Sequence, residues 1–180
     1  MNRSLNVDLP KLRGLSLFSG IGGDTLALSP YIETIAYCEK DKYCQSVLLS
    51  RMSDGLLSNA PIWDNIRSLS SDTLPEGIDI IYGGSPCQQL STHNPMGKGL
   101  AGKDSILFFE LTRLVNEIRP KFVFLENVHG IVGKSLKEVC TTFTQLGYCF
   151  EWTVIPATGV GASHLRRRWF MLAVSNTDEN

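Results

Sequence analysis

The chain has 180 residues, of which 43% are hydrophobic and 19% charged, and this balance is typical of a single soluble globular domain. Its formal net charge of −1 argues against a long basic footprint on nucleic acid, although residues 166–168 are three consecutive arginines. No apolar run approaches the roughly 20 residues of a membrane span, and the first residues show no secretory signal. We therefore expect a cytoplasmic or nucleoid-associated protein that is not secreted. Five irregularly spaced cysteines favour neither a disulfide framework nor a zinc site.

Short apolar runs alternate with amphipathic stretches along the whole chain. Apolar runs predict strands, and stretches of helical periodicity that stop near Pro120 and Gly147 predict helices. In chain order we expect a strand at 14–18, a helix from 24, a strand at 34–38, a helix at 41–51, a strand at 78–82, a helix at 106–118, a strand at 122–125, a helix at 135–146, and strands at 150–155 and 169–174. This order indicates an α/β fold, with a mostly parallel sheet and helices on both faces, in one domain that spans residues 1–180.

A glycine loop and an acidic residue follow the first two strands. Gly20, Gly22 and Gly23 lie between a strand and a helix, where glycines let a ligand approach the backbone and leave helix N–H groups free. Glu39 ends the next strand, and a carboxylate in that place suits the two adjacent hydroxyls of a ribose. Together they predict a site for a nucleoside-containing cofactor, although the spacing is not the dinucleotide pattern. The alternative is a tight turn beside a surface glutamate.

A cysteine and a glutamate follow two later strands. Cys87 comes after Pro86, which fixes the local backbone, so the thiol is placed like a nucleophile. Glu126 ends a neighbouring strand, where partial burial would raise its pKa and suit it to donate a proton. Because ligands bind beyond the carboxyl ends of the strands in such a sheet, we expect both residues to share one site with the glycine loop. The alternatives are an inert buried cysteine and a glutamate that caps a turn.

Five motifs, in this order, resemble those of the DNA cytosine-C5 methyltransferase family and cover almost the whole chain. FSGIGG at 18–23 resembles the first motif of the family, and GSPCQ at 84–88 resembles its catalytic Pro-Cys motif in the serine form. KGL at 98–100 together with LFFE at 107–110 is similar to the de novo DNA methyltransferases. ENV at 126–128 and the R-x-R pattern at 166–168 resemble two later motifs. The resemblance implies a Rossmann-like methyltransferase fold that binds S-adenosylmethionine.

The resemblance also implies a role for each catalytic residue. The Cys87 thiolate attacks C6 of a cytosine that is flipped out of duplex DNA, while Glu126 hydrogen-bonds to N3 and shares a proton with it. The activated C5 takes the methyl group of S-adenosylmethionine, and loss of the C5 proton then expels Cys87. Arg168 holds the cytosine O2, Arg166 supports Cys87 or nearby phosphates, and Asn127 positions the catalytic loop.

By the same resemblance, the cofactor lies across Phe18 and the glycine loop, with its ribose on Glu39. Ile66 and the polar Asn65 flank the adenine. Leu107 touches the cofactor near its amino-acid end. The predicted cofactor site is therefore assembled from four separate parts of the chain.

The sequence departs from the family pattern in three places. Asn65 stands where the family usually has Asp, and Asp64 would fill that role after a shift of one residue. Lys40 follows the ribose-binding glutamate, where an aromatic residue is common. The family normally continues past the position of Asn180 into a target-recognition region and two later motifs.

Three functions therefore stay open. The first is methylation of duplex DNA, either weakly by the chain alone or with a second protein chain or self-association that completes the C-terminal region. Neither a membrane nor a metal takes part in it, and the sequence leaves open whether the chain is active alone. The second is a catalytically inactive or partner-dependent remnant that acts as a binding or regulatory protein. The third is methylation of RNA or of a free cytosine nucleotide. The motifs do not determine the target sequence or the biological role, for which restriction protection, phage evasion and regulation are all compatible.

Overall fold

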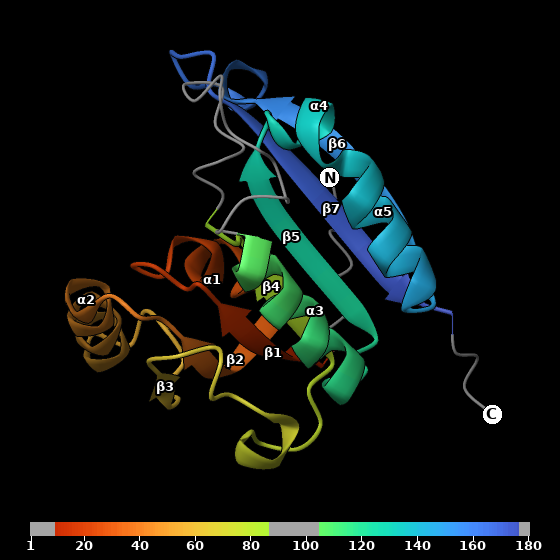
Figure 1. Cartoon of the computed structure of the whole chain (residues 1–180). Coiled ribbons are helices and arrows are strands. Elements are labelled where there is room, and N and C mark those ends of the chain that lie inside the picture. Colours follow the sequence, from red (N-terminus) through yellow and green to blue (C-terminus); the bar gives the residue numbers. More distant parts are fainter. Residues whose placement is uncertain (1–9, 87–104, 177–180) are drawn as a thin grey trace, which may run out of the picture.

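The computed structural model describes residues 10–86 and 105–176, which form one seven-stranded sheet flanked by helices (Figure 1). The strands are β1 (Leu12–Leu17), β2 (Ile32–Cys38), β3 (Ile62–Trp63), β4 (Ile80–Gly83), β5 (Phe122–Val128), β6 (Tyr148–Pro156) and β7 (Arg167–Ser175). The helices are α1 (Gly23–Leu28), α2 (Lys42–Ser53), α3 (Ser105–Ile118), α4 (Ile131–Lys134) and α5 (Leu136–Gln145), with short turns η1 (Ser71–Thr73) and η4 (Ala157–Val160). Sequence patterns do not predict β3, α4 or the two turns, because each is too short to show a period.

The strand order is β3-β2-β1-β4-β5-β7-β6. β1 pairs in parallel with β2 and β4, and β4 pairs in parallel with β5, whereas β7 runs antiparallel between β5 and β6. The predicted mostly parallel sheet is thus confirmed. At β1 and β4 the order of strands reverses, which opens a crevice at the carboxyl ends of these two strands. The loops that follow β1 and β4 therefore meet at one place.

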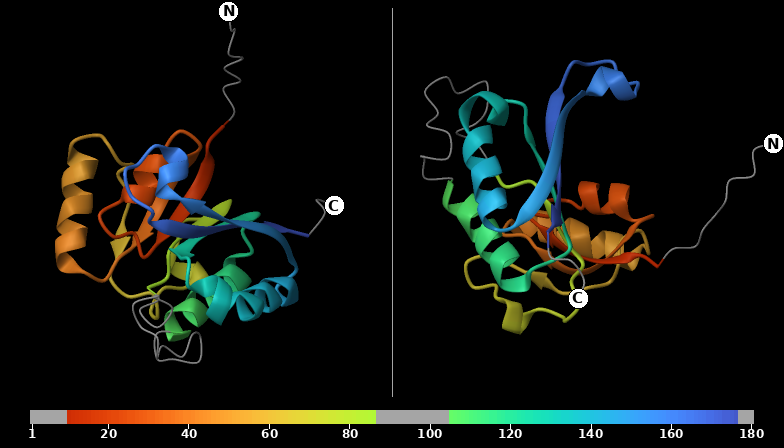
Figure 2. Two further views of the ribbon diagram at one scale, coloured as in Figure 1. Left: turned by 90° about the horizontal axis from the view of Figure 1, so that it is seen from above. Right: turned by 90° about the vertical axis from the view of Figure 1, so that its right-hand side faces the viewer.

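Helices cover both faces of the sheet, as the alternating pattern predicts. α3 and α5 pack on one face, where Leu111, Phe143 and Trp169 are buried in the largest core. α1 and α2 pack on the other face, around smaller cores that contain Tyr82 and Leu48. The right-hand view of Figure 2 shows the two helical layers on opposite sides of the strands.

Strand β5 is longer than the sequence pattern predicts. It continues through Glu126 and Asn127 to Val128, whereas the apolar run ends at Leu125. The prediction that Glu126 and Asn127 follow the strand is wrong, because β7 pairs with β5 as far as Arg168 opposite Val128 and keeps it extended. The parallel partner β4 ends opposite Leu125. Glu126 therefore still lies at the carboxyl edge of the parallel part of the sheet.

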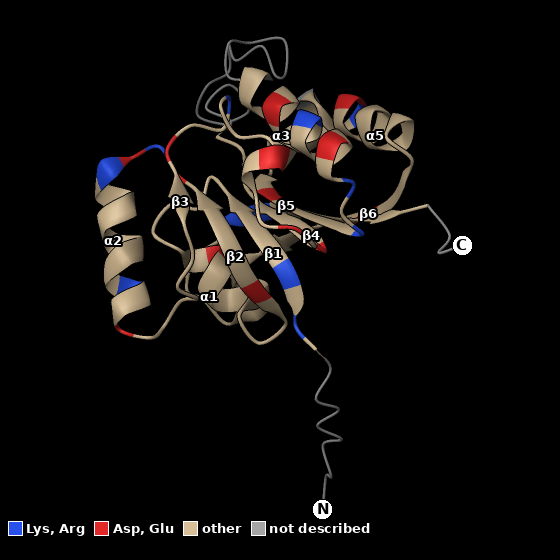
Figure 3. Ribbon diagram, turned by 90° about the horizontal axis from the view of Figure 1, so that it is seen from below, with Lys and Arg blue, Asp and Glu red and all other residues tan. Residues whose placement is uncertain are grey.

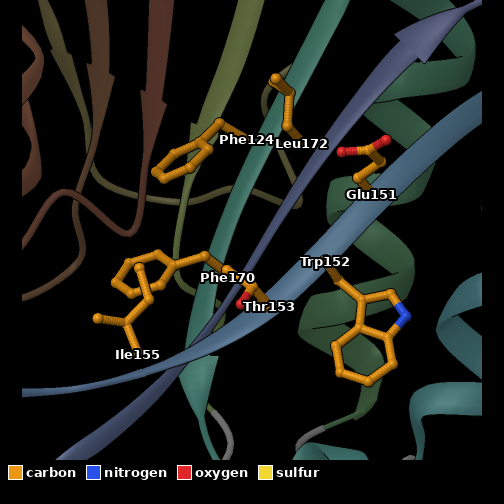
Figure 4. A pocket seen from close by; sticks show the side chains of 7 residues that line it. All are labelled: Phe124, Glu151, Trp152, Thr153, Ile155, Phe170 and Leu172. Carbon is orange, nitrogen blue, oxygen red and sulfur yellow. The ribbon is translucent and has the colours of Figure 1, made fainter. Parts of the chain in front are cut away.

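Strands β5, β7 and β6 together present an apolar surface, which we call the β5–β7–β6 face. It surrounds a hollow of about 400 Å³ lined by Phe124, Glu151, Trp152, Thr153, Ile155, Phe170 and Leu172. The rings of Phe124 and Phe170 stack with 5.9 Å between centroids, and Leu172 is 45% exposed. In Figure 4, Phe124, Phe170 and Ile155 lie on one side of the strands, while Trp152 points away from them. This face is open to solvent although its side chains are mostly apolar.

The described part of the chain holds neither a membrane-spanning helix nor a metal cluster. Across residues 10–86 and 105–176, every helix is too short or too polar to cross a membrane. Within the same ranges, no three His, Cys, Asp or Glu side chains gather as metal ligands would.

The four cysteines in these ranges are free, and burial raises the pKa of the Cys38 thiol to about 12, so this thiol stays protonated.

Candidate active site

The loop after β1 bends sharply and exposes its backbone. Phe18, Gly20 and Gly22 have positive φ angles of 55°, 52° and 87°, a region that is costly for a residue with a side chain such as Phe18. Gly22 is the N-cap of α1, and a Cβ added there would lie 2.7 Å from Leu57. A Cβ added at Gly20 or Gly23 would meet no atom within 4 Å. The loop therefore packs on the protein through Gly22 and leaves open space beside Gly20 and Gly23.

Glu39 is held against this loop by both oxygens of its carboxylate. Oε2 accepts a hydrogen bond from the N–H of Gly20 at 2.7 Å, and Oε1 accepts one from the N–H of Asp41 at 2.8 Å. An ionised carboxylate offers about four acceptor positions, so both oxygens can still accept from ribose hydroxyls. The structure thus brings Glu39 next to the glycine loop, from which it is 19 residues distant in the chain.

Three apolar residues predicted to contact the cofactor converge on the largest core. Ile66, on the segment after β3, is 5% exposed and belongs to that core. Phe18 from the loop after β1 and Leu107 from α3 are partly buried and pack against the same core. Three separate elements therefore contribute these side chains to the same core.

The two polar residues before Ile66 have different environments. The Asn65 Oδ1 accepts the N–H of Arg67 at 3.0 Å and closes a local turn. The Asp64 side chain is 67% exposed and lies 3.9 Å from the Lys42 ammonium, a surface pair worth about 1 kcal/mol at most. The Asn65 oxygen has a second lone pair beyond the one used in this turn, and the Asp64 carboxylate is exposed to solvent. Both residues therefore stay candidates to accept a hydrogen bond from the adenine amino group.

Glu126 and Arg168 form an ion pair between β5 and β7 at the carboxyl edge of the sheet. Burial raises the pKa of Glu126 above its ordinary value, and the charge of Asp24 raises it further. Arg168 and Arg166 oppose this shift in the pKa of Glu126 by stabilising the carboxylate. The structure therefore gathers Glu126, Arg166 and Arg168, and a carboxyl group with a raised pKa is suited to donate a proton.

The loop after β4 lies directly against Glu126. A Cβ added to Gly84 would come within 2.8 Å of the Glu126 Oε2 and within 2.9 Å of its carbonyl oxygen. The Asn127 Nδ2 donates a hydrogen bond to the carbonyl oxygen of Ser85 at 3.2 Å. Strand β5 thus fixes the backbone of the predicted catalytic loop. The predicted nucleophile, Cys87, lies outside the described residues.

Sequence patterns miss two residues at this edge. Asp24 lies in the first turn of α1, where an acidic residue ordinarily stabilises the helix, yet its charge also acts on Glu126. Trp169 is buried, and its Nε1 has no hydrogen-bond partner among the described residues. It borders a small cavity that Ser85, Glu126 and Asn127 also line. A tryptophan in an apolar strand ordinarily indicates only core packing, so the sequence gives no signal for this position.

The sequence matches the C-5 cytosine-specific DNA methylase family over residues 12–180. The chain belongs to this family. The type II methyltransferase M.HhaI of Haemophilus parahaemolyticus is 35% identical to it over 173 residues, which are 93% of this chain and 50% of that protein. The type II methyltransferase M.CviJI of Paramecium bursaria Chlorella virus IL3A is 33% identical over 163 residues, 90% of this chain and 43% of that protein. The chain thus spans about half the length of the curated relatives it matches.

Solved methyltransferase structures share the fold of this chain. The Entamoeba histolytica methyltransferase EhMeth has a TM-score of 0.75 at 16% identity, and the match covers 96% of this chain and 55% of that chain. Schizosaccharomyces pombe Dnmt2 has a TM-score of 0.69 at 18% identity, with 95% and 52% covered. The predicted Rossmann-like α/β fold is confirmed. Family membership implies S-adenosylmethionine as the cofactor, and the open space at Gly20 beside Glu39 fits its nucleoside part.

The Glu39→Gln substitution is expected to weaken binding of S-adenosylmethionine about tenfold or more. Glutamine has one acceptor oxygen, so it loses one of the hydrogen bonds from Gly20 and Asp41 and turns a donor toward the loop. Calorimetric titration with S-adenosylhomocysteine measures the change, and Glu76→Gln, at an exposed site, is the control. Equal affinities of the two variants would contradict the assignment of Glu39 to the ribose.

Proposed function

We propose that this methylase chain transfers a methyl group from S-adenosylmethionine to C5 of cytosine in duplex DNA, with residues 1–180 acting as one catalytic domain. The observation that carries the proposal is the pair of Glu126 and Arg168 beside the backbone of Gly84. The glycine loop and Glu39 lie at the same edge of the sheet, after the adjacent strands β1 and β2. The proposed proton donor and the proposed nucleoside site therefore lie at one edge of the sheet, which suits transfer between two bound reactants. Because M.HhaI and M.CviJI are named type II methyltransferases, we favour a role in restriction-modification.

The proposed reaction proceeds through a covalent adduct on Cys87. Its thiolate sulfur bonds to C6 of the cytosine, the C5–C6 π pair forms a C4–C5 double bond, and the C4–N3 π pair moves to N3, which takes the proton of Glu126. When bound, S-adenosylmethionine would supply an electrophilic methyl group to the enamine carbon C5, as its sulfonium S–CH3 bond breaks to leave S-adenosylhomocysteine. Loss of the C5 proton to a base expels the thiolate and restores the C5–C6 double bond, while N3 returns its proton to Glu126.

Further residues position these groups in the proposal. Arg168 orients Glu126 through their ion pair and holds the O2 of the base. Arg166 adds positive charge that favours the thiolate or binds nearby phosphates. Asn127 and Pro86 fix the loop after β4, the first through a hydrogen bond and the second through its restricted φ.

Methyl transfer from radiolabelled S-adenosylmethionine to mixed-sequence duplex DNA tests the proposal, with Cys87→Ala as the matched variant. We expect label from the wild type and none from the variant. We also expect a covalent adduct with DNA that contains 5-fluorocytosine, because fluorine blocks the loss of a proton from C5. Parallel reactions with RNA and with a free cytosine nucleotide would identify a different acceptor. A wild type that binds S-adenosylhomocysteine but labels no acceptor would instead support an inactive binding protein.

We also propose that the β5–β7–β6 face binds a further polypeptide segment, which belongs to a second protein chain or to a second copy of this chain. Ile155 and Leu172 are 39% and 45% exposed on this face, and burying such apolar side chains favours association. The curated relatives carry about as much polypeptide again as this chain. Sedimentation analysis should show self-association, or a complex with the unmatched half of M.HhaI. A chain that stays monomeric in both measurements would contradict the proposal.

A further inference from the structure

Arg113 lies in the middle of α3 and reaches the segment that follows β3. Its Nη2 donates hydrogen bonds to the carbonyl oxygens of Ile66 and Leu69, at 3.0 and 2.9 Å. These two residues are 5% and 1% exposed, and the N–H of Leu69 donates to the carbonyl oxygen of Ile66 at 3.3 Å. One guanidinium nitrogen therefore holds both ends of the turn that carries the predicted adenine contact.

Two carboxylates on the same helix fix this guanidinium. The Nε of Arg113 donates to the Glu110 Oε2 at 2.8 Å, and its Nη1 donates to the Glu117 Oε1 at 2.7 Å. Glu110 and Glu117 lie about one turn before and after Arg113, and Figure 3 shows that α3 carries charged positions of both signs. Because the guanidinium is planar and held at two edges, Nη2 stays directed at the segment after β3.

We propose that Arg113 is a positioning residue for the cofactor, which holds segment 65–69 in the conformation that presents Asn65 and Ile66 to the adenine. The inference rests on the proposed function and on the family resemblance, which implies that Asn65 and Ile66 flank the adenine of its cofactor. Leu107, which is expected at the amino-acid end of the cofactor, lies on the same helix. α3 would therefore set the spacing between the two ends of the cofactor site.

The test compares Arg113→Lys with Arg119→Lys in the full chain. Arg119 follows α3 and also donates a hydrogen bond to a backbone carbonyl oxygen, that of Leu146 at 2.6 Å. Leu146 lies between α5 and β6, away from the segment that follows β3. Lysine keeps the charge but cannot reach two carboxylates and two carbonyls at once. For Arg113→Lys we expect about tenfold faster amide exchange in segment 64–74 and about tenfold weaker binding of S-adenosylhomocysteine. Arg119→Lys should leave both quantities unchanged and speed exchange only near 144–148.

A second variant keeps the test decisive should Arg113→Lys fail to fold. Glu117→Gln removes one carboxylate anchor without touching the segment, and it should speed exchange in 64–74 by a smaller factor. Unchanged exchange in that segment, or equal affinities of the Arg113 and Arg119 variants, would overturn the positioning role and leave the proposed function intact. A wild type that binds no S-adenosylhomocysteine would overturn the proposed cofactor site, and the positioning role with it.

Discussion

Replacing Glu126 with glutamine is expected to slow methyl transfer about 10²- to 10⁴-fold, the range that general acid catalysis contributes. Glutamine keeps the size of the side chain and can hydrogen-bond to N3, but it has no proton to transfer. The main-chain pairing of Glu126 with Phe170 is unaffected, so the strand stays in place. Single-turnover transfer of radiolabel to duplex DNA measures the rate, and Glu33→Gln, exposed on β2, is the control. Equal rates for the Glu126 variant and the wild type would exclude Glu126 as the proton donor.

The Glu126→Gln substitution is also expected to change how the free energy of unfolding depends on pH. Burial raises the pKa of Glu126 in the folded state, so the folded protein binds this proton more tightly than the unfolded chain does. The resulting stabilisation is fully present below the ordinary pKa and is lost as the pH rises through the raised pKa. The difference in unfolding free energy between wild type and Glu126→Gln should therefore fall across that window and be constant above it. Urea unfolding at several pH values measures it, and a difference that does not change with pH would contradict the raised pKa.

Replacing Gly83 with alanine is expected to lower the free energy of unfolding by about 3 kcal/mol or more. Gly83 ends β4 with a φ of 147°, and a Cβ there would lie 1.9 Å from the carbonyl oxygen of Leu17. That oxygen belongs to β1, and Leu17 is the register partner of Gly83, so it cannot move without loss of strand pairing. Urea unfolding followed by tryptophan fluorescence measures the loss.

Gly55→Ala is the matched control for this prediction. Gly55 also has a positive φ, 71°, but a Cβ there would meet no atom within 4 Å. Its replacement should therefore cost only the backbone term, about 1–2 kcal/mol. If Gly83→Ala lost no more stability than Gly55→Ala, the close approach of β1 and β4 would not be what excludes a side chain at position 83.

The fold class and one edge of the site follow from local patterns in the sequence. Short apolar runs predict most strands, because such a run is a property of a few neighbouring residues. The glycine loop and Glu39 can be placed for the same reason, since each directly follows a strand. α4 and β3 escape prediction because four or two residues cannot show a period.

The sequence by itself therefore determined the α/β alternation, the family motifs and the positions of the glycine loop and Glu39 after their strands. Only the tertiary structure decided how far β5 extends, because the antiparallel partner that keeps Glu126 in a strand comes from residues near the end of the chain. It also decided the ion pair of Glu126 with Arg168 and the hydrogen bonds of Arg113 to a segment 47 residues away. These features depend on burial and on contacts between distant residues, and no local window of sequence contains that information.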